Sequence, residues 1–241
     1  RYDARMVLRM HCTIEIDGTP VELVRWVGNQ RSFYRPWELA GLRIWFDAAD
    51  ALFGYLNENH RACRPRKHAR FAIQDARLEI CPVLLHPWCP LPDDGLRIQN
   101  AYAGSDCWMG PYAGADAHGG LDINHPAGTP IWAPVNLDEH GLFDAVADGA
   151  SNNRWRGITR WADGSTWVIQ VHHVISVHPE AGPVPAGTHI ADGAGISVGA
   201  YEHSHFVFTV IEPGAGEEDA IVLDPWILFW QMYRDRKRTT A

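Results

Sequence analysis

The sequence predicts a mainly β fold in two parts, and three observations indicate this organisation. Short β-branched and aromatic runs recur after residue 95, separated by clusters of Gly, Pro, Asn and Asp. A proline-rich segment at 86–94 disfavours both helix and central strand, which indicates a boundary between two parts of the chain. The only clear helix-entry signal after this boundary is Asp224 followed by Pro225, near the carboxyl end.

The amino-terminal region, residues 1–95, is expected to be α+β or β-rich, with no role that its residues assign. Two apolar-rich runs, at 6–10 and 21–26, flank a turn signal at 17–20, which predicts two strands joined by a turn. Residues 36–56 fit a helix in part, but Gly41 and the run 42–46 also fit a strand, so both remain open. The run 78–85 is expected to be a strand.

Residues 96–231 form the second expected domain. Its predicted strands lie at 121–123, 130–135, 167–177, 195–198 and 205–210. The run from Asp224 to Trp230 is expected to form a short closing helix. Residues 232–241 are a basic tail, within which 234–238 is expected to be disordered.

Composition excludes several classes of protein. Of the 241 residues 46% are hydrophobic, enough for a substantial core, and the formal net charge is −8. This charge argues against nucleic acid and against anionic membrane surfaces as partners, because both need basic patches. No apolar run is long enough for a transmembrane segment. The chain begins at Arg1, so we expect an export signal that has been trimmed.

The five cysteines, Cys12, Cys63, Cys81, Cys89 and Cys107, include no Cys-x-x-Cys pair and all precede the histidine motifs described next. They are therefore not the expected metal ligands. An odd number permits two disulfides and one free thiol, as in an exported protein, but buried reduced cysteines are equally compatible with the sequence.

Nine of the thirteen histidines lie between His118 and His205. The first cluster is His118-Gly-Gly-Leu-Asp122, in which two glycines favour a loop that enters a strand. Such a junction could bring an imidazole and a carboxylate to one zinc ion. Taken alone, His-x-x-x-Asp is a common spacing, and a hydrogen-bonded surface pair is its more frequent explanation.

The second cluster is His203-Ser-His205, followed by an apolar run. On a strand, alternate side chains share a face, so His203 and His205 point together and away from Ser204 and Phe206. Two imidazoles backed by an apolar face suit a metal site. Two half-exposed histidines on an edge strand would give the same pattern.

The third cluster is His172-His173, within the expected strand 167–177. Regular alternation places His173 with Val171 and Ile175, and His172 with Gln170 and Val174. Either histidine could reach a site, and alternation alone does not choose between them.

The order of these motifs resembles the lysostaphin/LytM-type zinc endopeptidases over about residues 115–230. The segment from His118 to Pro134 looks like that family's His-x-x-x-Asp followed by a Gly-Thr-Pro turn, and His203-Ser-His205-Phe206 looks like its His-x-His-Phe. Between them, His173-Val174, the glycines of 182–187 and the turn at 190–195 match its His-Leu and glycine pattern in order.

The resemblance implies an antiparallel β-sheet catalytic domain with a central groove and one Zn²⁺ per chain. It implies that His118, Asp122 and His205 are the metal ligands, and that His173 and His203 are catalytic residues beside the metal. Zinc lowers the pKa of a bound water to about 7, so the implied reaction is hydrolysis of an amide in a peptide crosslink of bacterial peptidoglycan. An enzyme acting on this polymer is expected to be secreted, periplasmic or at the cell surface.

Val171 and Val207 stand where the family commonly has a tyrosine and an acidic residue, which leaves the substrate open. Trp108, Tyr112, Trp132 and His172 are candidate substrate-binding residues, since aromatic side chains can stack on sugars or hold a peptide. For the tryptophans and the tyrosine, packing in the core and loops is the more frequent alternative. A zinc-dependent polysaccharide lyase on the same scaffold and a non-catalytic cell-wall binding module are the alternatives. His125, His140, His178 and His189 belong to no motif and are expected at the surface.

Overall fold

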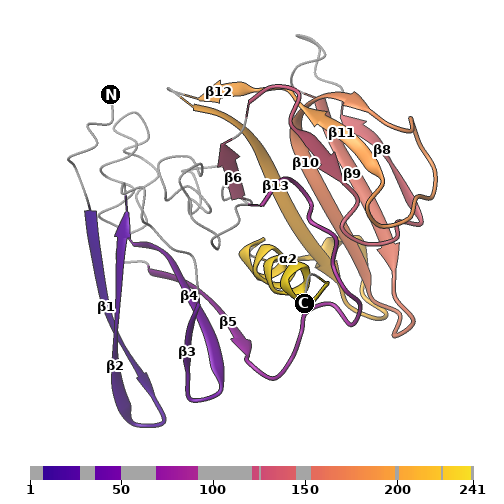
Figure 1. Ribbon diagram of the computed structural model, residues 1–241. Coiled ribbons are helices and arrows are strands. Elements are labelled where there is room, and N and C mark those ends of the chain that lie inside the picture. The colour runs from indigo at the N-terminus through magenta and orange to yellow at the C-terminus, as the bar shows by residue number, and fades with distance from the viewer. Residues whose placement is uncertain are drawn as a thin grey trace. The chain divides into compact units, whose positions relative to one another are not determined.

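The structure is a computed structural model that describes residues 8–27, 36–49, 69–91, 121–124, 126–144, 153–198, 201–223 and 225–239. The chain divides into two compact units (Figure 1). The first comprises residues 1–79 and 94–119, and the second comprises residues 80–93 and 120–241. Segment 80–93 thus belongs to the second unit, although it precedes the junction expected near residue 95.

The first unit contains two small antiparallel sheets in its described part. β1 (Leu8–Ile16) pairs with β2 (Thr19–Val27) through a turn in which Asp17 and Gly18 both have positive φ. The second sheet has the order β3–β4–β5, with β3 at Trp37–Leu39, β4 at Leu42–Ala49 and β5 at Ala69–Asp75. Leu23 and Ile44 form the fully buried centre of this unit's core. Residues 36–49, for which the sequence allowed either a helix or a strand, therefore contain strands.

The expectation of a strand at 78–85 was wrong. These residues form bends and irregular backbone rather than pairing with a neighbouring strand. Within the first unit, the guanidinium of buried Arg43 donates hydrogen bonds to the carbonyl oxygens of Ala76 (2.6 Å) and Leu78 (3.1 Å). Backbone groups that a strand would pair with another strand are thus bound by a side chain.

The second unit is built on one large antiparallel sheet. Its main path is β12–β13–β10–β11–β7, with β6 and β14 also paired to β13, β9 to β10, and β8 to β9. The strand bounds are β6 Leu121–Asn124, β7 Pro130–Trp132, β8 Glu139–Asp144, β9 Asn153–Arg160, β10 Thr166–Val177, β11 His189–Gly193, β12 Ile196–Val198, β13 Tyr201–Ile211 and β14 Ile221–Leu223. The fold is mainly antiparallel β, as the sequence predicted.

One face of this sheet carries the core. Phe206 and Phe208 on β13, Ile169 and Val171 on β10, and Trp155 on β9 are fully buried. The ring of Phe208 lies edge-to-face against Trp167 at 5.0 Å. Full burial of one such aromatic side chain stabilises the fold by roughly 1.5–3 kcal/mol. Burial therefore determines which face of each strand packs on the core, and the alternate residues are left on the opposite face.

The helix α2 (Trp226–Thr239) packs on the core face beside β13 (Figure 1). Phe229 contacts the ring of Phe206 at 5.3 Å and stacks on Trp88 at 5.9 Å. The predicted helix is therefore confirmed, but it is longer than expected, and the prediction of disorder at 234–238 was wrong. The helix continues to Thr239 because Met232, Tyr233 and Asp235 are buried on its inner side.

Candidate metal centre

The two faces of β13 differ in chemistry, and this difference defines the candidate site. Ser204, Phe206 and Phe208 have no exposed surface and face the core. Because side chains alternate along a strand, His203 and His205 belong to the opposite face. The side chain of His205 is still mostly buried, with 9% of the residue exposed. The predicted common face of the two histidines agrees with the backbone of β13.

The strands on either side of β13 place a carboxylate residue and a third histidine next to His205. Asp122 on β6 is the backbone partner of His205 on one side, and His172 on β10 is its partner on the other side. Directly opposed residues on antiparallel strands point to the same face, with Cβ atoms about 5 Å apart. Asp122, His205 and His172 therefore form one row across three strands.

Described side chains on this face contact one another beside the row. The imidazole rings of His172 and His205 lie 4.9 Å apart between centroids. The Nε2 of His172 is 3.2 Å from the Oε1 of Gln170, an acceptor that orients the ring when Nε2 carries the hydrogen. Phe143 at the end of β8 lies 6.1 Å from His172 between ring centroids. The face opposite the core thus carries a continuous group of polar and aromatic side chains around His205.

A β-bulge at His173 breaks the regular alternation that we expected along β10. His173 has a φ of 64°, which is unusual for a residue with a side chain, and the register of β10 against β9 shifts between His172 and Val174. Val174 is consequently fully buried with Val171, whereas Ile175 is exposed. The expectation that Val171 and Ile175 share a face was wrong, because the bulge inserts one extra residue.

The remaining predicted site residues fall into two groups. His118, Trp108 and Tyr112 lie outside the described residues, and for Asp122 and His203 the backbone alone is described. Trp132 is half-buried on β7, where its ring contacts His86 at 5.8 Å. In the sheet order, β10 and β11 lie between β7 and β13, so Trp132 is not on a strand next to His205.

The donor set around His205 fits a zinc ion in its chemistry. Zinc takes imidazole nitrogen and carboxylate oxygen, and the backbone register sets a histidine and an aspartate directly opposite each other. Among the side chains that the structure describes, no group of three or more His, Cys, Asp or Glu could hold a metal ion. Of the three predicted ligands, only His205 has a described side chain, so His118 and Asp122 are not included in that statement.

Sequence reasoning missed three residues on this face, namely Gln170, Phe143 and Arg154. Arg154 on β9 is the backbone partner of His172, so it continues the row beyond β10. The strand β9 alternates between buried and exposed positions, and arginines occupy three of its outward positions. That period of two was visible in the sequence and could have predicted this strand and its outward face.

His140 lies on the other side of β8, where the sequence predicted a surface residue. This expectation was wrong, because only 6% of His140 is exposed. The indole N–H of Trp155 donates a hydrogen bond to its Nδ1 at 3.0 Å, so the hydrogen of the neutral ring is on Nε2. Burial lowers the pKa of His140, which favours this neutral form.

Comparisons with known proteins give similarity only at the level of structure. No protein-family model and no curated protein sequence matches the chain. The structure is similar to lysostaphin, the antimicrobial peptidase from Staphylococcus simulans, with 20% identity over 52% of this chain and 49% of that chain and a TM-score of 0.38. The matched region therefore spans about half the length of lysostaphin.

Two further solved structures are similar to this chain. LytU matches with 22% identity over 59% of this chain and 81% of its own, with a TM-score of 0.34. A mutant of the catalytic domain of EnpA, a prophage-encoded M23 protein from Enterococcus faecalis, matches with 20% identity over 46% and 78%, with a TM-score of 0.32. Lysostaphin, whose family the ordered motifs resemble, is thus among the structures that are similar to this chain in fold.

Among the described residues, no helix is long and apolar enough to cross a membrane.

Proposed function

We propose that this chain is a zinc-dependent hydrolase, and specifically an endopeptidase that cleaves peptide crosslinks of bacterial peptidoglycan. The observation that supports it most is the register that brings Asp122 of one motif directly opposite His205 of another. These residues are far apart in the sequence, and the resemblance assigns both as ligands of one ion. A surface pair or an edge-strand pair would not require this register.

His118, Asp122 and His205 would hold the ion. A site with three protein ligands leaves a fourth position open, as catalytic zinc sites do. When bound there, zinc would supply Lewis-acid polarisation of the scissile carbonyl and a nucleophile at neutral pH. The buried position of His205 favours this chemistry, because electrostatic interactions are stronger where water is excluded.

His203 and His173 are the proposed catalytic residues. His203 shares the outward face of β13 with His205, two residues away, so it can accept or donate a proton at a substrate lying on this face. His173 lies next to His172 at the bulge, with ring centroids 6.5 Å apart. Both are candidates for stabilising the oxyanion and for protonating the leaving amine.

The substrate would lie along the outward face of the sheet. His172 is proposed as a substrate-binding residue, and Trp108 and Tyr112 as further ones. A peptidoglycan substrate also implies a secreted, periplasmic or cell-surface location, which we retain as a proposal. The second domain predicted to begin near residue 96 stays a separate proposal. Residues 1–95 are left without a proposed role.

The direct test is cleavage of purified bacterial peptidoglycan, followed by labelling of newly formed amino groups. We expect new amines with the wild type, and a loss of roughly 10²-fold or more in rate for His203→Ala. His178→Ala is the matched control. His178 follows the end of β10, is exposed and pairs with Asp192, so this variant should cleave at the rate of the wild type.

Three outcomes would contradict the peptidase. New reducing ends from peptidoglycan without new amines would indicate an enzyme that acts on the glycan. Unsaturated uronides released from a uronate polysaccharide, tested in parallel, would indicate a lyase. Zinc binding without cleavage of either polymer would indicate a binding module.

A further inference from the structure

An open pocket of about 580 Å³ lies in the second unit, between β8, β9 and the segment that follows β10. It contains none of the proposed metal ligands or catalytic histidines. Its apolar wall includes Leu142, Ile158, Ile175 and Val177, and its one cationic side chain is Arg156. This volume is within the range of small-molecule and peptide side-chain sites, about 300–1,000 Å³.

Arg156 lies on the same face of the sheet as the candidate centre. It follows Arg154 by two residues on β9, and Arg154 is the direct partner of His172. Residues two apart on a strand share a face, so Arg156 and His172 point to the same side. The contacts agree, because the guanidinium of Arg156 lies 5.8 Å over the ring of Phe143, which in turn contacts His172.

The surroundings of Arg156 leave its charge available. Among the described side chains, no carboxylate lies within ion-pair distance of it. Its partner on β8 is Gly141, which has no side chain to fill the space beside the guanidinium. Arg160 on the same strand differs, since it donates a hydrogen bond to Glu139 at 2.6 Å. Arg156 is therefore a cation next to apolar surface without a described counter-ion.

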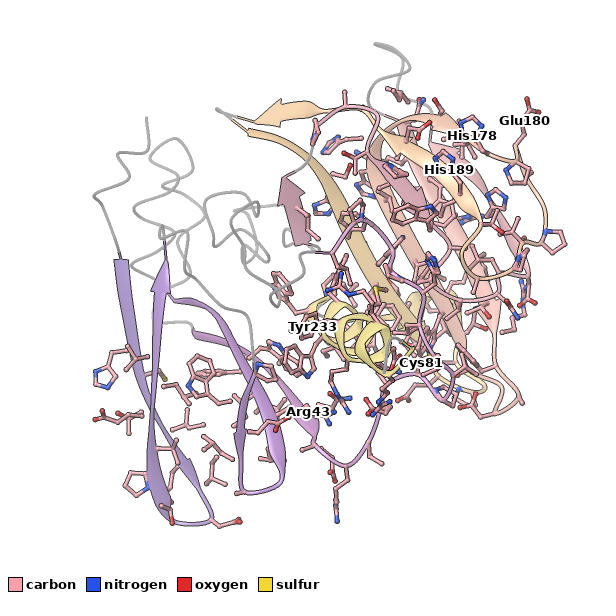
Figure 2. The ribbon with its side chains drawn as sticks, in the orientation of Figure 1. Arg43, Cys81, His178, Glu180, His189 and Tyr233 are labelled. Atoms are coloured by element: carbon pink, nitrogen blue, oxygen red, sulfur yellow. The ribbon has the colours of Figure 1, made fainter. Side chains whose placement is uncertain are left out.

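Two acidic residues on the pocket wall limit what the pocket can hold. The charge of Glu139 is compensated by Arg160. Glu180 is exposed at the outer edge of the unit, in the segment after β10 (Figure 2). One available guanidinium beside an exposed carboxylate suits a ligand with a single negative charge, and disfavours a multiply charged group such as a phosphate.

We propose that this pocket is a substrate subsite that binds a single carboxylate of a peptide through Arg156, with an aliphatic part of the peptide on the wall formed by Ile158, Ile175 and Val177. Arg156 matches a carboxylate in planar geometry and can bind it with two hydrogen bonds. The carboxylate could be a peptide's carboxyl terminus or an acidic side chain. As a subsite for the peptide substrate, this proposal rests on the proposed function.

The test measures binding of three blocked dipeptides to the full chain by NMR titration: N-acetyl-Ala-Leu, its carboxyl amide, and N-acetyl-Glu-Leu amide. We expect the amide without a carboxylate to bind about tenfold or more weakly than one of the two acids, since a charge-assisted pair is lost. The better acid identifies whether a terminal or a side-chain carboxylate is preferred. Shifts should appear at Gly141, Arg156 and Ile175.

Arg156→Gln should remove the preference for the acid, and Arg156→Lys should restore part of it. Arg154→Gln is the matched control, because Arg154 is on the same strand and face but does not line the pocket. It should keep the preference. An equal affinity for acids and amide, a preference that survives in Arg156→Gln, or no saturable binding by any probe would each overturn the subsite.

His205→Ala separates this proposal from the proposed function. The pocket does not include His205, so the variant should keep the preference for the acid while losing hydrolysis. If the wild type shows the preference but cleaves no peptide, carboxylate binding by Arg156 stands, whereas the peptidase and the pocket's role as its substrate subsite fail. If the preference disappears in His205→Ala, the carboxylate binds at the candidate metal centre and the subsite fails.

Discussion

At the scale of single residues, Gly157 on β9 occupies a position with no room for a side chain. A Cβ added there would lie 2.7 Å from the Cδ1 of Leu137 and 2.7 Å from the Cη2 of Trp155, both on buried side chains. We expect Gly157→Ala to lower the free energy of unfolding by about 1–3 kcal/mol, because the core must shift to admit the methyl group. Urea unfolding followed by tryptophan fluorescence would measure it.

Gly141→Ala on the neighbouring strand is the control for that variant. Its added Cβ would lie 3.5 Å from the carbonyl oxygen of Glu180, an ordinary contact. The free energy of unfolding should change by less than about 0.5 kcal/mol. Equal effects of the two substitutions would show that close packing at Gly157 is not the cause.

His140 should make stability depend on pH in the window just below 6.5, the ordinary pKa of a histidine. Burial lowers the pKa of His140 below the unfolded value of 6.5, so in this window the unfolded chain binds more protons than the folded chain. The stabilisation is complete above the unfolded pKa and is lost as pH falls toward the folded pKa. His140→Gln keeps an acceptor for Trp155 and should have a shallower decrease in unfolding free energy with pH than the wild type. Identical pH slopes for the two proteins would contradict this role.

The face on which each histidine lies was predictable from the sequence for β13 but not for β10. The common face of His203 and His205 follows from a strand's period of two, which the long regular strand β13 obeys. The bulge at His173 inserts one residue without any glycine or proline to signal it, so the faces of Val174 and Ile175 could not be read from the pattern. The bulge became visible only in the pairing of β10 with its neighbours.

At the scale of elements, α2 holds the segment 80–93 by side-chain hydrogen bonds. Gln231 accepts from the backbone N–H of Cys81 at 3.0 Å and donates to its carbonyl oxygen at 2.9 Å. The carboxylate of Asp235, which is 1% exposed, accepts from the N–H of Leu85 at 2.9 Å. This explains how a segment without strand pairing is held on the unit.

Asp235→Leu should release this segment. The variant leaves the buried N–H of Leu85 without its acceptor, at a cost of about 1–3 kcal/mol. Hydrogen exchange at residues 81–85 should become faster in the variant than in the wild type. Arg238→Gln is the control, since it removes a half-exposed partner of Asp235 and leaves the hydrogen bond to Leu85 in place. Unchanged exchange in Asp235→Leu would contradict the anchoring role.

The elements themselves were predictable where local pattern and packing agreed. The hairpin of β1 and β2 has a clear turn signal between two apolar runs. The end of α2 did not follow from composition, because the charged run 234–238 is typical of a solvated tail. One side of that run is buried, however, as Asp235 lies against segment 80–93 and Arg236 donates to the carbonyl oxygen of Leu91. These are tertiary contacts, which a local pattern does not contain.

At the scale of the whole molecule, the cysteines limit the number of disulfides. Cys12, Cys81 and Cys89 are free thiols, so of five cysteines only Cys63 and Cys107, which lie outside the described residues, could pair with each other. Burial raises the pKa of Cys81 to about 11 and that of Cys89 to about 12. Both thiols should therefore be unreactive in the folded protein at neutral pH.

Titration with a thiol reagent, carried out without reductant, tests which cysteines are free and reactive. At least three thiols should react after unfolding, whereas in the folded protein Cys81 and Cys89 should be protected and Cys12 should react. Fewer than three thiols in the unfolded chain would show a disulfide that the structure does not have. Disulfide pairing could not be predicted from the sequence, because cysteine spacing alone does not define it.

The metal centre is the central claim, since the motifs that define it come from three separate parts of the chain. Elemental analysis should find about one zinc per wild-type chain, with loss of the metal in His118→Ala and in His205→Ala, and retention in the control His178→Ala, all checked for folding by circular dichroism. A folded, metal-replete wild type without zinc, or ligand variants that keep their zinc, would contradict the account.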